Sequence, residues 1–120
     1  MPIVDIQIVA APDTELPGAL AAQLADALGT VFQAGPGRVW VRLQRLADSG
    51  YAENATTERV RPVFVRVLHA DLPAPATLAA QAAAVAAAVA ACLPCAASQV
   101  HVEYAPAGRG RMAFGGQLLQ

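Results

Sequence analysis

Apolar and polar positions follow two different periods along this chain, and the same order of patterns occurs twice. A proline followed by a run rich in β-branched residues spans 2–9 (PIVDIQIV) and again 62–69 (PVFVRVLH), which is typical of β-strands. Segments with helical spacing follow at 17–33 and 75–92, and both contain the letters LAAQ. Alternating strands are then predicted at 38–44 and 99–104. The repeat predicts two fused strand-helix-strand units, covering about 2–60 and 62–120.

The first predicted helix, about 17 to 33, has local start and stop signals. Thr14 or Asp13 is placed to cap it, Pro17 suits its first turn and Gly35 suits its end. Its apolar positions recur at helical spacing and comprise Leu20, Leu24, Ala27, Leu28 and Val31. These signals predict an amphipathic helix with one buried side.

The second predicted helix, about 75 to 92, consists largely of alanine, which favours helix throughout. Pro94 prevents its continuation. Its predicted buried stripe comprises Leu78, Ala82, Val85, Val89 and Leu93. It resembles the first helix in length and in its place between two strands.

A strand, a helix and a second strand in this order predict a right-handed parallel β-α-β unit. Two copies predict an α+β fold with one four-stranded sheet and two helices on one face. The other face is left uncovered, and exposing Trp40, Phe64 and the neighbouring aliphatic side chains would be costly. We therefore expect a closed oligomer. A ferredoxin-like regulatory module with interleaved strands stays an alternative, which a monomer or dimer in solution would favour.

The totals limit the class of protein. A chain of 120 residues with 56% hydrophobic and 14% charged residues suits one packed domain. Its net charge of -1, with eight arginines and no lysine, gives no basic surface for nucleic acid. The apolar stretch 78–93 is too short and too weakly hydrophobic to be expected to span a membrane. No export signal is recognised, so a cytoplasmic location is expected.

Two cysteines, Cys92 and Cys95, form a C-L-P-C pair of the kind found in redox motifs. Reactive pairs usually lie at a helix N-terminus, where the dipole lowers the thiol pKa. This pair lies at the end of the second predicted helix. We therefore expect inert cysteines.

The chain begins with MPIV, has two proline-led halves and ends in FGGQLL. With these features it resembles the tautomerase superfamily over essentially its whole length. Fused 4-oxalocrotonate tautomerase and the macrophage migration inhibitory factor type are the most similar groups. The resemblance implies a homotrimer in which each site borrows a strand from a neighbouring subunit.

The same resemblance implies that Met1 is removed and that Pro2 becomes a catalytic general base. An N-terminal amine titrates near pH 8 in water, and burial among apolar groups or beside arginines disfavours its charged form. A neutral amine can take a proton from the carbon next to a carbonyl. Pro62 cannot act in this way because its nitrogen is an internal amide. The alternative is that Pro2 only begins an edge strand.

Two strand positions correspond to residues that line the pocket in the resembling proteins. Arg38 is expected to hold a substrate carboxylate, and His101 is expected to donate to the substrate's carbonyl or carboxylate. A solvated edge charge for Arg38 and a half-buried strand residue for His101 fit equally well.

The glycine-rich tail supplies the remaining candidates. Met112 and Phe114 correspond to apolar groups that wall the site, although packing at a subunit interface is equally compatible. Arg109 and Arg111 are candidate carboxylate clamps, and solvated loop arginines are the alternative.

Departures from the family limit the substrate. Pro12 stands where short tautomerases place a substrate-binding arginine, and the residues that dehalogenating and hydrating relatives use are missing at 70–75 and near Pro106. We expect a small 2-oxo or 2-hydroxydienoate acid or an arylpyruvate as substrate, with no metal or organic cofactor. A non-catalytic trimeric binding protein of the same fold is the alternative function.

Overall fold

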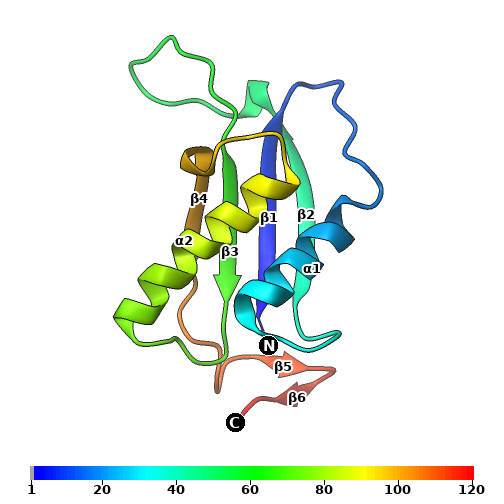
Figure 1. The fold of residues 1–120 in the computed structure, drawn as a ribbon, viewed down its shortest axis with the longest axis vertical. Coiled ribbons are helices and arrows are strands. Elements are labelled where there is room, and N and C mark those ends of the chain that lie inside the picture. The colour runs from blue at the N-terminus through cyan, green and yellow to red at the C-terminus, as the bar shows by residue number, and fades with distance from the viewer. Residues whose placement is uncertain (1) are drawn as a thin grey trace.

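The computed structural model describes residues 2–120, and its main element is a four-stranded sheet with two helices on one face (Figure 1). The strand order is β2-β1-β3-β4. The strands are β1 (Ile3–Ala10), β2 (Trp40–Ala47), β3 (Val63–Leu68) and β4 (Val100–Tyr104). The predicted α+β architecture is therefore confirmed.

The two outer pairs of strands are parallel, and the central pair is antiparallel. β1 runs parallel to β2, β3 runs parallel to β4, and Ile3 of β1 lies opposite Leu68 of β3. At the other end of this pair, the Val9 N–H donates to the Pro62 carbonyl at 3.1 Å. Pro2 and Pro62 therefore lie at opposite ends of the strands. We call these two ends of the sheet the Pro2 end and the Pro62 end.

The first helix, α1 (Leu20–Phe32), begins later than its sequence signals predicted. Pro17 lies outside it because residues 17–20 form a turn in which the Leu20 N–H donates to the Pro17 carbonyl at 3.1 Å. Its N-cap residue is Ala19, with no side-chain cap, so the expected cap at Asp13 or Thr14 is wrong. Its C-terminal cap is Gln33 in the left-handed conformation (φ 52°), so Gly35 is not needed to end it.

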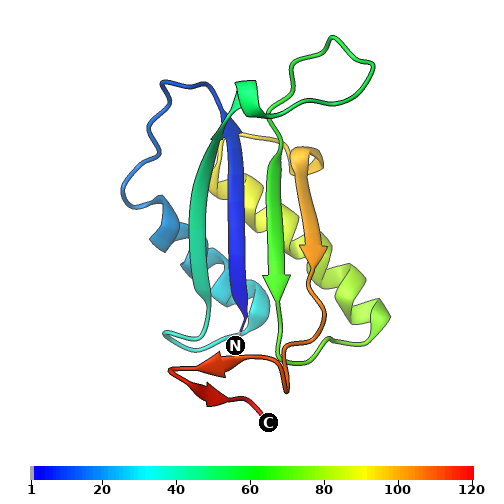
Figure 2. The same ribbon diagram turned by 180° about the vertical axis from the view of Figure 1, so that it is seen from behind.

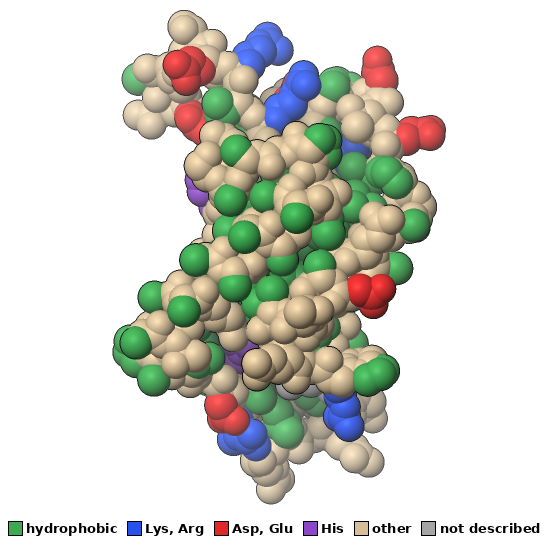
Figure 3. Space-filling view, in the orientation of Figure 1, with side chains coloured by type: hydrophobic (Ala, Val, Ile, Leu, Met, Phe, Trp, Pro, Cys, Tyr) green, Lys and Arg blue, Asp and Glu red, His purple; other side chains and the backbone are tan. Residues whose placement is uncertain are grey.

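The second helix, α2 (Pro75–Cys92), has the predicted bounds, with proline in its first turn. It buries Val85, Val89 and Ala90 against the rest of the fold, while most of its alanines stay exposed. In Figure 3 the helical face is mostly uncharged, and charged side chains gather toward its two ends. By length and composition α2 is apolar enough to cross a membrane, contrary to the sequence-based expectation, although core helices of globular domains meet the same criterion.

The core lies between the helices and one face of the sheet. Alternate residues of the strands supply Val4 and Ile6 from β1 and Val65 and Val67 from β3, all at most 1% exposed. Leu24 of α1 is fully buried against them. Burying one such aliphatic side chain contributes about 1.5–3 kcal/mol. This one-sided core fixes which strand residues face the helices.

The opposite sheet face has no helix of residues 2–120 over it (Figure 2). It is more polar than the sequence suggested, because its rows contain Asp5, Arg42, Arg66 and Glu103 in ion pairs. Of the two aromatic side chains expected on this face, Phe64 is half-buried and Trp40 is 44% exposed. This face therefore exposes less apolar surface to water than the sequence suggested.

After β4 the chain crosses the Pro2 end and forms a small hairpin of β5 (Ala113–Phe114) and β6 (Gln117–Leu118). The turn consists of Gly115 and Gly116, both with positive φ (57° and 86°), which glycine adopts without strain. The glycine-rich tail thus folds into a hairpin. Figures 1 and 2 both place it beside the start of β1.

Candidate active site

Pro2 is buried at the start of β1. Its carbonyl accepts a hydrogen bond from the Trp40 N–H at 3.1 Å, so this carbonyl points toward β2. The hydrogen bond ties Pro2 to the start of β2, at the Pro2 end of the sheet.

An aromatic pair stands beside Pro2. The rings of Trp40 and Phe114 pack edge to face, with centroids 5.3 Å apart and planes at 86°. The Trp40 indole also donates to the Gly37 carbonyl at 3.0 Å, in a turn where Gly37 has a φ of +74°. The pair therefore joins the start of β2 to the C-terminal hairpin.

Met112 is the second apolar group of the tail, and it packs over Gly108. A Cβ added at position 108 would overlap the Met112 side chain and would lie 3.4 Å from the His69 carbonyl oxygen. The Met112 N–H donates to the Gly108 carbonyl at 2.9 Å. Glycine at 108 thus lets the tail lie close to the end of β3 with Met112 folded back on it.

A recess of about 360 Å³ opens on the uncovered sheet face at the Pro2 end. Arginines from three elements reach it: Arg42 from β2, Arg66 from β3 and Arg111 from the tail. The other lining residues are Ile3, Asp5, Leu68, Ala105 and Pro106. Ile3, the residue after Pro2, lines the recess, whereas Pro2 itself is not among the lining residues.

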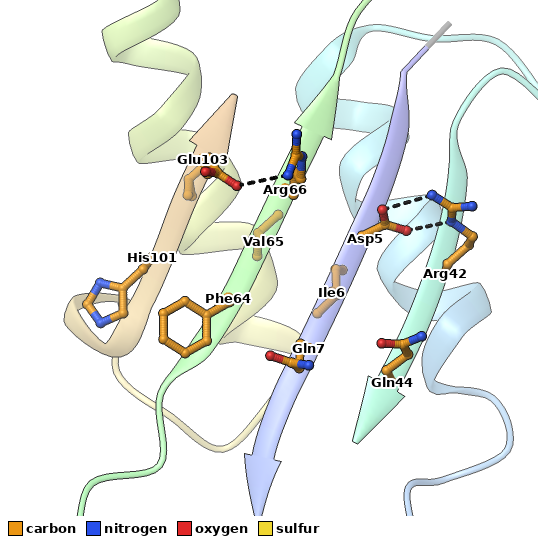
Figure 4. Close-up of a pocket in the computed structure, with 11 residues that line it drawn as sticks. Asp5, Ile6, Gln7, Arg42, Gln44, Phe64, Val65, Arg66, His101 and Glu103 are labelled. Atoms are coloured by element: carbon orange, nitrogen blue, oxygen red, sulfur yellow. Dashed lines mark hydrogen bonds and ion pairs between the residues drawn. The ribbon is translucent and has the colours of Figure 1, made fainter. Parts of the chain in front are cut away.

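The three arginines differ in what they bind. Arg42 makes two hydrogen bonds to the Asp5 carboxylate, of 2.5 and 2.8 Å, and this contact raises the pKa of Arg42 (Figure 4). Arg66 lies 3.6 Å from Glu103. Arg111 makes no ion pair within residues 2–120. Among these three side chains, Arg111 is the one left to bind an anion in the recess.

Arg42 and Arg66 were not among the residues singled out from sequence. The alternation of β2 and β3 places both on the uncovered face, which is the signal that could have found them. They flank β1 from β2 and β3, and this arrangement depends on strand order, which periodicity alone does not give.

Arg38 lies in the turn that precedes β2, because β2 begins at Trp40 rather than at Arg38 as predicted. Its N–H donates to the Gly35 carbonyl at 3.2 Å, and its side chain is exposed. It makes no ion pair in the described part of the chain. It lies at the Pro2 end, just before β2.

His101 lies at the other end of the sheet. It pairs with Phe64, and Phe64 pairs with Gln7, five residues along β1 from Pro2. At about 3.3 Å per residue this is roughly 16 Å along the strand, before the lateral separation of the strands is counted. His101 instead lines a groove of about 650 Å³ on the uncovered face, beside the Phe64 ring (Figure 4). One chain does not bring His101 to Pro2.

Arg109 is engaged by other groups of the chain. Its guanidinium donates to both carboxylate oxygens of Asp71, at 2.9 and 2.6 Å, and to the Gln120 backbone carbonyl at 2.6 Å. The Arg109 guanidinium lowers the pKa of Asp71. This arrangement leaves Arg109 poorly placed to hold a substrate carboxylate.

The remaining chemistry-bearing groups lie elsewhere. Cys92 and Cys95 are unpaired, and burial raises the pKa of the Cys95 thiol, which fits the inert cysteines predicted from sequence. Within residues 2–120, no group of three His, Cys, Asp or Glu side chains is placed to hold a metal ion.

The architecture matches solved structures of low sequence identity. A wild-type fused 4-OT designated Q0, a symmetric trimer, is 21% identical with a TM-score of 0.77, over 97% of this chain and 94% of that chain. Macrophage migration inhibitory factor from Oncomelania hupensis is 18% identical with a TM-score of 0.76, over 100% and 83%. Pt0534, inactivated by 2-oxo-3-pentynoate, is 18% identical with a TM-score of 0.75, over 97% and 94%.

No protein-family model matches the sequence, and comparison with curated proteins finds no match. The structural matches cover nearly the whole chain and agree with one another on the fold. The chain therefore has the tautomerase superfamily fold that the proline-led repeat predicted.

Proposed function

Because the chain has the tautomerase fold, we propose that it is a cofactor-independent tautomerase with Pro2 as general base. The observation that carries this proposal is a buried proline at the start of β1, one residue before Ile3, which lines a recess reached by three arginines. The substrate is a small 2-oxo or 2-hydroxydienoate acid or an arylpyruvate. Pt0534, a structural relative, is inactivated by a 2-oxo acid, which supports this class of substrate.

The proposed reaction requires removal of Met1, because only then is the Pro2 nitrogen an amine. Burial beside apolar groups and near arginines lowers the pKa of such an amine, so that it is neutral near pH 7. Its lone pair takes a proton from the carbon next to the substrate carbonyl. The electrons of the C–H bond form the C=C bond of the enolate, and the π electrons of the C=O bond move onto the oxygen. The resulting ammonium returns the proton to another atom of the enolate.

Side chains at the Pro2 end take separate parts in this proposal. Arg111 binds the substrate carboxylate, and Arg38 assists from the α1-β2 turn. Positive charge also stabilises the enolate as it forms. Met112 and Phe114 form an apolar wall that limits water around the amine.

The proposal includes a homotrimer, because His101 is too far from Pro2 within one chain. The uncovered sheet face supplies a surface for neighbouring copies, and fused 4-OT structures of this fold are trimers. In such an assembly His101 of one subunit completes the site of the next and donates to the substrate. Size measurement in solution tests the assembly, and a monomer would contradict it.

The deciding experiment compares a chain that begins at Pro2 with a chain that retains Met1, each verified by mass spectrometry. We expect the first to catalyse phenylpyruvate enolisation and the second to be inactive, because an amide nitrogen is not basic. Circular dichroism serves as the folding control. Equal rates from both chains would contradict Pro2 as the base, and ligand binding without turnover by either would favour a non-catalytic binding protein.

A further inference from the structure

The C-terminal arm, residues 108–120, is tied to the end of β3 through its backbone. The Gly108 N–H donates to the His69 carbonyl at 2.8 Å, and the Arg109 N–H donates to the Ala70 carbonyl at 3.0 Å. Within the arm, the Leu119 N–H donates to the Met112 carbonyl at 2.8 Å. The arm is therefore one hydrogen-bonded unit that is fixed to the sheet at its beginning.

The side chain of Arg109 adds a second attachment. Its forked contact with Asp71 joins the arm to the loop that follows β3, and its contact with the Gln120 carbonyl joins the two ends of the arm. A planar guanidinium suits this double role because its donors point in fixed directions. Arg109 therefore holds the beginning and the end of the arm against one loop.

The held segment is the wall of the candidate site. Met112 and Phe114 both belong to it, and Phe114 rests on Trp40. The hairpin itself extends beyond the ends of the strands at the Pro2 end (Figure 2). We infer that Arg109 and Asp71 are positioning residues which hold the Met112–Phe114 wall beside Pro2, and that Arg109 does not bind substrate. The kinetic part of this inference rests on the proposed function, whereas the structural part does not.

The tie is adjustable because it lies at the surface. The Arg109 and Asp71 side chains are 45% and 65% exposed, so dissolved salt screens their attraction. High ionic strength should weaken the hold on the wall while leaving the backbone hydrogen bonds in place. Trp40 is the only tryptophan of the chain, and its fluorescence reports directly on the Phe114 contact.

The test measures acrylamide quenching of Trp40 in Arg109→Gln and Asp71→Asn. The matched control is Arg61→Gln, which breaks an arginine-aspartate pair at the Pro62 end. We expect stronger quenching in the first two variants and wild-type quenching in the control. The double variant Asp71→Arg, Arg109→Asp restores the pair with reversed polarity but not the contact with Gln120, so quenching should return part of the way to the wild-type value.

The kinetic part follows phenylpyruvate enolisation in the same variants. We expect kcat/KM to fall about threefold to fivefold in Arg109→Gln, which is the size of effect that an exposed ion pair can have. In the double variant kcat/KM should recover in part. A higher KM with unchanged Trp40 quenching and no recovery would show that Arg109 touches substrate and would overturn the inference. Unchanged quenching and unchanged rates would also overturn it. If the wild type lacks enolisation activity, the proposed function fails while the quenching result still decides the positioning role.

Discussion

The Pro2 end and the Pro62 end of the sheet have similar sequences and different chemical surroundings. Each begins with a buried proline whose carbonyl accepts a strand N–H at 3.1 Å. At the Pro62 end, Arg61 contacts Asp48, and Arg45 donates to the carbonyls of residues 11 and 12. At the Pro2 end, Arg111 enters the recess without an ion pair among residues 2–120.

The difference shows that repeating a strand-helix-strand unit does not repeat a site. Pro62 has an amide nitrogen because residue 61 precedes it, so it can never be a base. Two arginines near it, Arg45 and Arg61, hold loops. The proposed reaction requires a terminal amine, an arginine without an ion pair and an apolar wall in one place, and we propose that the Pro2 end combines them once Met1 is removed.

The largest expected effect comes from exchanging each proline separately for alanine. Pro2→Ala replaces the secondary amine with a primary amine of altered position and basicity, and we expect kcat to fall about 10²-fold to 10⁴-fold, the range of general base catalysis. Pro62→Ala should keep kcat per folded molecule and lower only the free energy of unfolding. Enolisation assays measure kcat of both variants, and thermal unfolding measures their stability. Equal losses of kcat in the two variants would contradict the difference between the two ends.

The next effect separates the arginines of the two ends. Arg111→Gln should raise KM about 10-fold to 100-fold, since a hydrogen bond to a charged group of the substrate is lost. Arg61→Gln is the matched control and should leave KM unchanged. Steady-state kinetics with phenylpyruvate decide this, and an unchanged KM in Arg111→Gln would assign the carboxylate to another group.

A smaller effect is expected from the wall. Phe114→Ser admits water near Pro2, so the pKa of its amine should rise and less of it should be neutral at pH 6. The acidic limb of the kcat/KM profile then moves to higher pH, and Phe114→Leu, which keeps the site apolar, should move it less. A profile that stays in place in Phe114→Ser would show that this wall does not set the pKa of the base.

The smallest effect concerns stability in acid. Arg109 lowers the pKa of Asp71 below its ordinary 3.8. The pair therefore contributes stability above about pH 3.8 that is lost as pH falls through the lowered pKa. In Arg109→Gln the free energy of unfolding should depend less on pH between about 4 and 2, as urea titrations would measure. If the free energy of unfolding depends on pH as it does in the wild type, the pair adds no stability.

Much of the fold follows from local pattern. The strands and α2 could be predicted because β-branched runs, alternation and an alanine tract extend over several residues, and Pro94 lies just past the end of α2. The start of α1 could not, since residues 17–20 form a turn that leads into the helix. Local signals for capping residues did not outweigh that turn.

The candidate site was less predictable because it depends on residues far apart in sequence. Arg109 and Asp71 are 38 positions apart, and only the folded chain shows that they meet. Arg42 and Arg66 converge because β1 lies between β2 and β3, an order that follows from packing. Pro2 became a candidate through the resemblance to the tautomerase superfamily, which requires no knowledge of tertiary contacts.

The proposed mechanism depends on a Pro2 nitrogen that is free and neutral near pH 7. Nitrogen-15 NMR of proline-labelled protein detects such a nitrogen, because the other eight of the nine prolines can only give amide signals. We predict one amine signal that titrates below the range of about 7.7–8 typical of N-terminal amines. Nine amide signals, or one amine that titrates above that range, would contradict the mechanism.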